Sequence, residues 1–504
     1  MRYDNARMDA QPVEKSRRSY AALVLLSFLA AWPPRAHADP GIEAELRAAL
    51  AKLPHASATV GACVIDLASD RVIFAQNADA GLMPASTMKL FAMTAALTEL
   101  GPQFAFDTVL ATDGANLIVV GDGDPGFGDE KLHRSRGETI AAPFERWANA
   151  LRQRGLTVLP GDLIIDETVF DDQRLHPSWE RGDLDNWYAA PVDGLNYNDN
   201  CLDLVVTPSK TRNAPPLVSV RPETSLPKIL NACQSGGNGK PTLHHAFDTI
   251  EYAVSGRCGK RVDLGSVSFP DPGLLFADSM RKVLARKGVV VRGRIRREHI
   301  RRPDGGLPGN LTIVAEQRTP LAAVLARAGK DSQNLFAECL LKRAGYAWAK
   351  HRGLPDPRGS WQLGGDAVAE MLHRAGINTR ELTVADGSGL SRHNACTAHQ
   401  LTAMLAWAYR QPFGPLLHDS LATAGVDGSL RKRLKDSEGR VHAKTGTMKG
   451  IRALAGYVDS DAGPRFAFAV LFNGYPGSSA PYKAIQDRVC RVLADACEPR
   501  AGTH

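Results

Sequence analysis

A helix predicted over residues 86–100 is apolar around most of its circumference. Pro84 lies just before it and Gly101 directly follows it, a common arrangement at the two ends of a helix. Because a helix with apolar side chains on all sides has to be buried, other elements of the chain must surround it. Residues 58–77 alternate apolar and polar side chains around turn signals, which predicts a β-hairpin before this helix. The fold therefore starts with two strands and a buried helix.

The pattern of the sequence changes twice after this helix. Residues 102–264 contain short strand-like segments separated by turns rich in Gly, Pro and Asp. Helix periodicity dominates residues 321–409, and residues 441–473 contain three further strand-like segments before a last helix that starts near residue 481. A chain of 504 residues is too long for one hydrophobic core. We therefore expect two or three domains.

The first 38 residues have the pattern of a secretory signal. A basic stretch at residues 15–18 precedes an apolar run over residues 20–32, and Ala36 and Ala38 place small residues where a signal peptidase reads them. The apolar run is shorter than the roughly 20 residues of a transmembrane helix. We predict a cleavable signal peptide, cleavage after Ala38, and no membrane span in the mature chain. An uncleaved membrane anchor is the alternative.

Charge gives little support for a nucleic-acid partner. Residues 1–38 contain six Lys or Arg and three Asp or Glu, so removing them lowers the formal net charge from +7 to +4. Such a mild excess over a long chain indicates solubility and tolerance of anionic wall polymers. We therefore expect no nucleic-acid binding.

All eight cysteines lie in the predicted mature chain, and none forms a C-x-x-C pair or a Cys/His cluster with zinc spacing. In an exported protein an even count suggests disulfides. We favour Cys233–Cys258, because both residues lie in one loop-rich stretch. Cys490 and Cys497 can pair only if the last helix ends between them, since an unbroken helix would hold them about 10 Å apart.

The tetrad Ser86-Thr87-Met88-Lys89 places a hydroxyl and an amine on one face of the predicted helix. If the pKa of Lys89 is lowered, its amine can accept the proton of Ser86 and activate the hydroxyl as a nucleophile. The same S-x-x-K pattern also occurs at residues 225–228, 279–282 and 429–432. Only the first match opens a buried helix after a small turn, so it is the candidate.

Ser332-Gln333-Asn334 is a second candidate segment. From a short turn, the Ser332 hydroxyl could pass a proton to a leaving amine, and the Asn334 amide could bind the backbone of a peptide substrate. Taken alone, the segment is better explained by Ser332 acting as the N-cap of the helix that follows.

Lys444-Thr445-Gly446-Thr447 is a third candidate segment. On a strand, Lys444 and Gly446 alternate with Thr445 and Thr447. A cation and hydroxyls there could bind a carboxylate, and the glycine would let a ligand lie against the strand. Taken alone, an exposed edge strand protected by a lysine explains the segment better.

The three segments together, in the order S-x-x-K, S-x-N and K-T-G, are the set found in penicillin-binding proteins and serine β-lactamases. Further matching segments are residues 189–191, 198–200 and 386–392. The chain resembles the D-alanyl-D-alanine carboxypeptidase/endopeptidases among the low-molecular-mass penicillin-binding proteins of class C. Ser86 and Ser332 are 246 residues apart, and Ser332 and Lys444 are 112 apart. The first interval is far longer than in a compact β-lactamase.

This resemblance implies an α+β fold. It consists of a transpeptidase-like domain, with an antiparallel sheet flanked by helices as in penicillin-binding proteins and serine β-lactamases, and two inserted β-rich domains. The catalytic domain would comprise residues 39–100 and 313–504. The second domain would comprise residues 101–190 and 265–312, with the third, residues 191–264, nested inside it.

For function, the resemblance implies a periplasmic serine D,D-peptidase. It would hydrolyse D-alanyl-D-alanine bonds and D-alanyl-diaminopimelate cross-links of peptidoglycan through an acyl-enzyme on Ser86, with Lys89 as the base and Ser332 as the proton donor. The backbone N–H groups of Ser86 and Thr447 would form the oxyanion hole. The side chains that bind the substrate would be Asn334, Lys444, Thr445 and Thr447. No cofactor or metal is expected.

The expected partners are peptidoglycan stem peptides and, as covalent inhibitors, β-lactam antibiotics. One alternative is a serine β-lactamase or esterase of the same fold, which the lack of an E-x-x-L-N motif disfavours. Another is a catalytically silent wall-binding protein, which the intact motifs disfavour.

Overall fold

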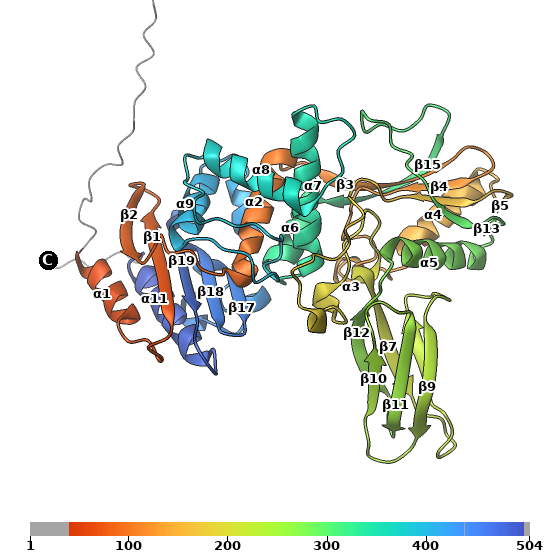
Figure 1. Cartoon of the computed structure of the whole chain (residues 1–504), viewed down its shortest axis with the longest axis horizontal. Helices are drawn as coiled ribbons and strands as arrows, with labels where there is room; N and C mark the ends of the chain where they lie inside the picture. Colours follow the sequence, from red (N-terminus) through yellow and green to blue (C-terminus); the bar gives the residue numbers. More distant parts are fainter. Residues whose placement is uncertain (1–39, 438, 498–504) are drawn as a thin grey trace, which may run out of the picture. The chain divides into compact units, whose positions relative to one another are not determined.

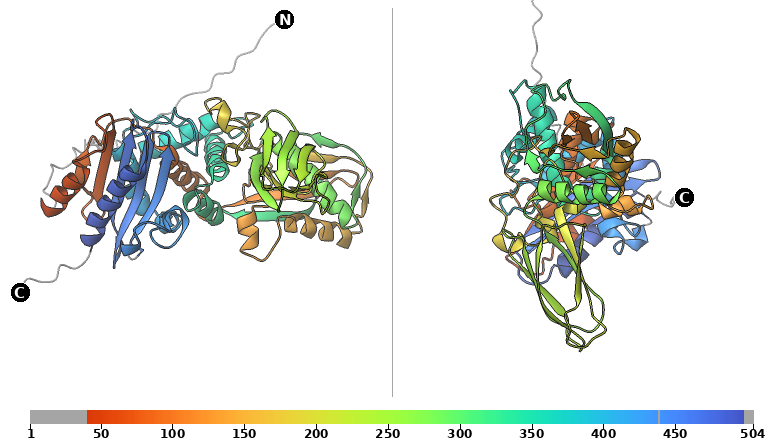
Figure 2. Two further views of the ribbon diagram at one scale, coloured as in Figure 1. Left: turned by 90° about the horizontal axis from the view of Figure 1, so that it is seen from below. Right: turned by 90° about the vertical axis from the view of Figure 1, so that its right-hand side faces the viewer.

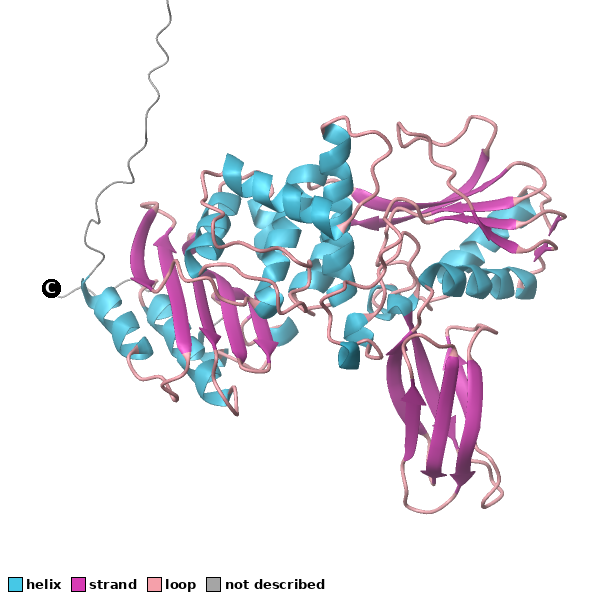
Figure 3. Ribbon diagram, viewed as in Figure 1, coloured by secondary structure: helices cyan, strands magenta, loops and turns pink. Residues whose placement is uncertain are grey.

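The computed structural model describes residues 40–437 and 439–497. The predicted signal peptide and its cleavage site therefore lie outside the described residues. Helices and mostly antiparallel sheets are mixed along the described chain, which confirms the predicted α+β class (Figure 3). Among these residues, none of the helices combines the length and the apolar character that crossing a membrane requires.

A six-stranded antiparallel sheet joins the two ends of the described chain (Figure 1). The predicted hairpin at residues 58–77 and the three strand-like segments at 441–473 all belong to it, so these predictions are confirmed. In spatial order its strands are β16 (Ala422–Thr423), β17 (Val441–Met448), β18 (Ile451–Ser460), β19 (Gly463–Asn473), β1 (Thr59–Asp66) and β2 (Arg71–Gln76).

Both faces of this sheet are covered. The helices α1 (Pro40–Leu50) and α11 (Ala480–Asp495) pack on one face (Figure 2, left). Leu454 of β18 is buried with them. On the other face, Ala455 of β18 packs against α9 (Ala398–Tyr409) and its neighbours. Alternate residues of one strand thus serve two hydrophobic cores, as the two-residue period of a strand requires.

The predicted central helix is buried, but its start differs from the prediction. Residues 85–88 form a 3₁₀ turn, and the α-helix α2 begins at Lys89 and ends at Leu100. Ala85 has a φ of 45°, which breaks the helical path just before Ser86. The helices that surround α2 are α6 (Leu321–Gly329), α7 (Asn334–His351), α8 (Trp361–Arg374) and α9.

The residues between α2 and α6 form separate sheets. A five-stranded sheet packs against α4 (Ala142–Gln153) and α5 (Pro272–Arg286) around a cluster of aromatic side chains. In spatial order its strands are β14 (Ile295–Arg297), β6 (Leu163–Asp166), β4 (Leu117–Val120), β3 (Ala105–Thr112) and β15 (Thr312–Pro320). Near it are the two-stranded pair β5 (Val158–Leu159) and β13 (Val290–Val291) and the short helix α3 (Glu130–Arg134).

Two three-stranded sheets lie side by side (Figure 1). Side chains of both sheets are buried together in a further core. One consists of β10 (Pro241–His245), β11 (Glu251–Cys258) and β9 (Lys228–Ser235). The other consists of β12 (Val262–Ser268), β7 (Cys201–Thr207) and β8 (Leu217–Arg221). The boundaries given above for three domains stay a prediction.

The predicted disulfide Cys233–Cys258 is not present, because all eight cysteines carry free thiols. The strands β9 and β11 are parallel neighbours, and Cys233 is opposite Gly256 rather than Cys258. A two-residue offset between adjacent strands separates the Cα atoms by about 8 Å, beyond the reach of an undistorted disulfide. The helix α11 does end between Cys490 and Cys497, yet these two thiols are also unpaired.

Candidate active site

Ser86 lies in the 3₁₀ turn before α2, directly beside strand β17. The close approach of the two segments depends on Gly446, since a Cβ atom there would be 2.7 Å from the Pro84 carbonyl oxygen and 3.2 Å from the Ser86 nitrogen. Gly446 therefore has a structural role that the sequence did not indicate. It makes room for the turn that holds Ser86.

Lys89 is completely buried one turn after Ser86. Its Nζ donates to Ser86 Oγ at 3.1 Å, to Asn334 Oδ1 at 2.7 Å and to the Ser388 carbonyl oxygen at 2.7 Å. Burial lowers the pKa of Lys89 to about 8, although the nearby carboxylates of Glu338 and Asp386 act in the opposite direction. A lysine with this pKa is neutral in about a tenth of the molecules at pH 7, far more than a lysine with an ordinary pKa, and can act as a base.

Ser332 and Lys444 form the second pair of the site. Lys444 Nζ donates to Ser332 Oγ at 2.8 Å and to the Thr445 carbonyl oxygen at 2.9 Å. Lys444 is fully buried, and burial, together with the charge of Lys89, holds its pKa well below the usual value. Two lysines thus share one site, each with a serine hydroxyl as partner.

Ser332 is not the N-cap of α7. The residue before this helix is Gln333, whose side chain accepts from the Asn334 backbone N–H. Ser332 itself has a φ of 61°, in the left-handed region that non-glycine residues rarely adopt. Such strain costs on the order of 1–3 kcal/mol and is common at functional sites. The simpler explanation offered by the sequence is therefore wrong.

Asn334 connects Lys89 to the inserted part of the chain. Its Oδ1 accepts from Lys89, and its Nδ2 donates to the Tyr188 carbonyl oxygen at 2.7 Å. Because both ends of the amide are engaged, the Oδ1 is held toward the lysine. In this arrangement, Asn334 can orient the amine of Lys89.

The two threonines of the K-T-G-T segment have polar partners that the sequence did not indicate. Thr445 Oγ1 donates to Ser429 Oγ at 2.9 Å, and Thr447 Oγ1 accepts from Arg452. Ser429 belongs to one of the accidental S-x-x-K matches, but it reaches the site through this contact. Arg452 is opposite Thr447 across the β17–β18 hairpin. The two-residue Lys-Gly turn of this hairpin was the signal that could have predicted that pairing.

Glu338 is a further residue that the sequence did not indicate. It lies one turn after Asn334 on α7 and is completely buried. It accepts from the backbone N–H groups of Gly387 at 2.8 Å and Ser388 at 2.9 Å, and from Trp361 Nε1 at 2.7 Å. Burial raises the pKa of Glu338 to about 7. This carboxyl group holds the loop whose Ser388 carbonyl receives Lys89.

The same loop is fixed from within by Asp386. Its carboxylate accepts from the backbone N–H groups of Gly389 at 2.7 Å and Ser391 at 2.6 Å, and from Trp179 Nε1 at 2.8 Å. The loop also contacts the nucleophile turn, because a Cβ atom on Gly389 would collide with the Ala85 carbonyl oxygen. The loop, the turn and Lys89 are therefore positioned together.

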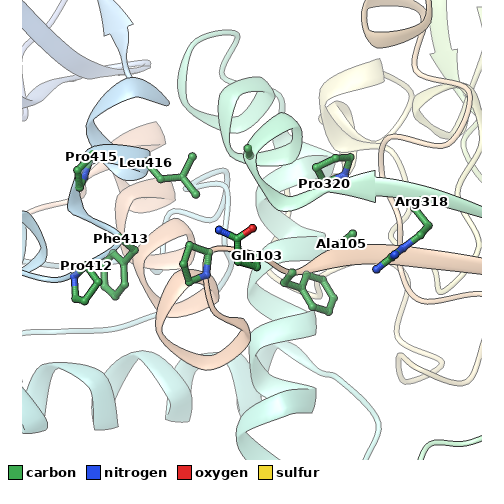
Figure 4. A pocket seen from close by; sticks show the side chains of 11 residues that line it. Gln103, Ala105, Arg318, Pro320, Pro412, Phe413, Pro415 and Leu416 are labelled. Carbon is green, nitrogen blue, oxygen red and sulfur yellow. The ribbon is translucent and has the colours of Figure 1, made fainter.

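A separate pocket lies at the opening of α6 and the start of α10 (Gly414–Asp419) (Figure 4). Its walls are mainly apolar and include Phe104, Pro320 and Phe413, with Arg318 at one side. None of the predicted site residues lines it. We assign no role in the chemistry of Ser86 to this pocket.

Comparison with known proteins gives matches along nearly the whole chain. The D-Ala-D-Ala carboxypeptidase 3 (S13) family matches residues 42–496. A D-alanyl-D-alanine carboxypeptidase from Actinomadura sp. is 30% identical over 509 residues, covering 94% of this chain and 89% of that protein. The D-alanyl-D-alanine carboxypeptidase DacB of Haemophilus influenzae is 26% identical over 441 residues, covering 84% of this chain and 87% of that protein.

Solved structures give the same result for the fold. The crystal structure of penicillin binding protein 4 from Haemophilus influenzae matches with a TM-score of 0.71 at 24% identity, covering 90% of this chain and 99% of that chain. Another structure of that protein, complexed with a β-lactam, matches with a TM-score of 0.66 at 23% identity. The predicted penicillin-binding-protein fold is confirmed. From the extent of these matches, the chain belongs to the D-Ala-D-Ala carboxypeptidase 3 (S13) family of serine-type D-alanyl-D-alanine carboxypeptidases.

Proposed function

We propose that this chain hydrolyses D-alanyl-D-alanine bonds of peptidoglycan stem peptides, and D-alanyl-diaminopimelate cross-links, through an acyl-enzyme on Ser86. The observation that carries the proposal is the contact between the Lys89 amine and the Ser86 hydroxyl, at 3.1 Å. A buried lysine with a lowered pKa beside a serine can act as the general base that activates the serine as a nucleophile.

In the first step, neutral Lys89 takes the proton of Ser86 Oγ while this oxygen attacks the carbonyl carbon of the scissile bond. The carbonyl oxygen becomes negative and is stabilised by the backbone N–H groups of Ser86 and Thr447, each worth roughly 3–4 kcal/mol in such a site. The C–N bond then breaks as Ser332 gives its proton to the leaving amine, and Ser332 recovers a proton from Lys444. In the second half of the reaction, Ser332 takes a proton from an attacking water and returns one to Lys444, while the water oxygen bonds to the acyl carbon. The acyl C–O bond then breaks as Lys89 gives its proton back to Ser86 Oγ.

The substrate carboxylate would bind beside strand β17. Thr445 and Thr447 offer hydroxyl groups there, and Arg452 contributes a positive charge next to Thr447. Burial lowers the pKa of Arg452, but a guanidinium stays protonated at any physiological pH. A free C-terminal carboxylate is therefore the feature of the substrate that this edge of the site selects.

β-Lactam antibiotics would acylate the same serine. A relative complexed with a β-lactam supports this part of the proposal. The predicted signal peptide supports export to the periplasm, where peptidoglycan is accessible. Carboxypeptidase and endopeptidase reactions break the same type of bond, so one site can perform both.

The test is to incubate the enzyme with purified pentapeptide and cross-linked muropeptides and to identify the products by mass spectrometry. We expect loss of one D-alanine from the pentapeptide and conversion of dimers to monomers. Ser86→Ala should abolish both reactions. Ser279→Ala, in another S-x-x-K match, is the matched control and should leave both intact. Unchanged muropeptides would refute the proposal, and rapid turnover of a chromogenic cephalosporin would favour the β-lactamase alternative.

A further inference from the structure

A cluster of two histidines and one aspartate lies apart from the residues of the peptidase site. His418 is near the end of α10, His442 is on β17 and Asp459 is near the end of β18. The three side chains are 13%, 17% and 18% exposed. They are thus largely, but not completely, shielded from water. The peptidase mechanism uses none of them.

The spacing of their polar atoms matches that of metal ligands. His418 Nε2 is 3.1 Å and His442 Nε2 is 3.5 Å from Asp459 Oδ2, and the three ligand atoms all lie within 4.8 Å of one another. Ligands at the usual bond lengths around a tetrahedral zinc ion are about 3.3 Å apart. A small inward movement of the two imidazoles would therefore complete three metal bonds.

The outer nitrogens of both imidazoles are also engaged. His418 Nδ1 is 3.0 Å from Asp419 Oδ1, and His442 Nδ1 is 3.3 Å from Thr423 Oγ1. When an outer acceptor receives the Nδ1–H, the lone pair of Nε2 is left for a metal. Such partners orient the histidine ligands in known metal sites. Here they turn both Nε2 atoms toward Asp459.

The backbone also helps to bring the Asp459 carboxylate and the two imidazoles together. A β-bulge at residues 458–459 shifts the register between β18 and β19, and bulges commonly redirect a side chain. The positive charge of Lys330 acts on His442 and would oppose a cation, but Lys330 is itself paired with Asp427 at 2.6 Å. The carboxylate of Asp427 thus offsets the positive charge of Lys330. The charge that a cation would meet in the cluster is that of two imidazoles and the Asp459 carboxylate.

We propose that His418, His442 and Asp459 form a binding site for zinc, with water in the fourth position. Nitrogen and carboxylate ligands in a tetrahedral arrangement suit this ion among the divalent metals. The ion would fasten α10 to β17 and β18. Because β17 also carries Lys444, this site would stabilise the strand that borders the peptidase site.

The first test uses the untagged full-length chain, since a histidine tag would itself bind zinc. After treatment with a chelator and dialysis, we expect one equivalent of Zn²⁺ to bind and to raise the Tm by about 2 °C or more. Titration with Co²⁺ should give the intense visible bands of a tetrahedral complex. Binding of less than 0.2 equivalents, or weak bands typical of six-coordinate Co²⁺, would overturn the proposal.

The second test assigns the ligands. His442→Gln and Asp459→Asn should each weaken Zn²⁺ binding by at least about 10-fold. His399→Gln is the matched control, because His399 also lies beside a carboxylate, Asp79, at 2.9 Å, but belongs to no three-ligand group found among the described residues. Circular dichroism checks that each variant is folded. Equal affinities of the three variants and the wild type would show that zinc binds elsewhere.

Discussion

Lys89 Nζ lies between Ser86 Oγ, at 3.1 Å, and the Ser388 carbonyl oxygen, at 2.7 Å. One contact points the amine at the hydroxyl that it would activate. The other ties it to a loop that is fixed by buried carboxyl groups. The base is therefore held by backbone and needs no substrate to reach its place, which is the preorganisation that efficient proton transfer requires.

The rate of acylation should depend on pH through Lys89. Only neutral Lys89 can accept a proton, and its pKa is about 8. The second-order rate constant with a fluorescent penicillin should therefore rise with pH from 6, reach half of its maximum near pH 8 and level off above about pH 9. A rate that is flat, or that falls between pH 7 and 8.5, is incompatible with Lys89 as the base.

Lys89→Arg should remove the base without removing the positive charge, because a guanidinium does not lose its proton in this range. We expect acylation to slow by about 10²- to 10⁴-fold, with a lower Tm, because the larger and permanently charged side chain has to fit a buried site. Stopped-flow labelling and thermal unfolding measure the two quantities. If the variant labels at the rate of the wild type, Lys89 is not the general base.

Glu338→Gln should shift the pH profile of acylation and should also lower the stability of the fold. The negative charge of Glu338 raises the pKa of Lys89, so its removal should shift the midpoint of the acylation profile to lower pH. The amide also presents N–H groups to backbone donors, and an unsatisfied buried group costs about 1–3 kcal/mol.

Denaturant unfolding measures this second effect. Glu370→Gln, on the neighbouring helix α8, is the control and should leave the midpoint unchanged. A loss of stability without a shift of the profile would mean that Glu338 supports only the fold.

Arg452→Ala should weaken recognition of the substrate carboxylate. Hydrogen bonds to charged groups contribute about 1.5–3 kcal/mol, which corresponds to a loss of kcat/KM of about 10- to 100-fold for a D-alanyl-D-alanine peptide. The same peptide with a C-terminal amide should be a poor substrate of the wild type and should lose little more in the variant. If Arg452→Ala lowers kcat/KM equally for both peptides, Arg452 does not bind the substrate carboxylate.

Gly389→Ala should damage the nucleophile turn. Gly389 has a φ of 80°, and a Cβ atom there would meet the Ala85 carbonyl oxygen. Gly376 has a φ of 72° with no atom within 4 Å of the added Cβ, so Gly376→Ala isolates the backbone strain of about 1 kcal/mol.

We expect Gly389→Ala to lose clearly more stability than Gly376→Ala and, unlike it, to slow acylation. Calorimetry and penicillin labelling of the two variants provide the comparison. Equal effects would mean that the contact with Ala85 is unimportant.

Local patterns predicted much of this fold. The hairpin at residues 58–77, the buried helix and the last three strands follow from periodicity and turn residues, which act over short distances. The motif segments also indicated Ser86, Lys89, Ser332 and Lys444 as neighbours, and the structure brings them together through two direct lysine–serine contacts.

Other features depend on contacts between distant segments, which a single sequence does not contain. Glu338 is one of several polar residues of α7, and its role is visible only when the loop that it holds is placed beside it. The zinc ligands come from α10, β17 and β18, so they have no motif spacing. The favoured disulfide was wrong because strand register, not closeness in sequence, sets the distance between two thiols.

The most direct measurement for the central claim is peptide mapping by mass spectrometry after brief reaction with a penicillin. We expect one penicilloyl group per chain, carried by the peptide that contains Ser86, and no adduct in Ser86→Ala. An adduct on another residue, or undiminished labelling of Ser86→Ala, would contradict the account.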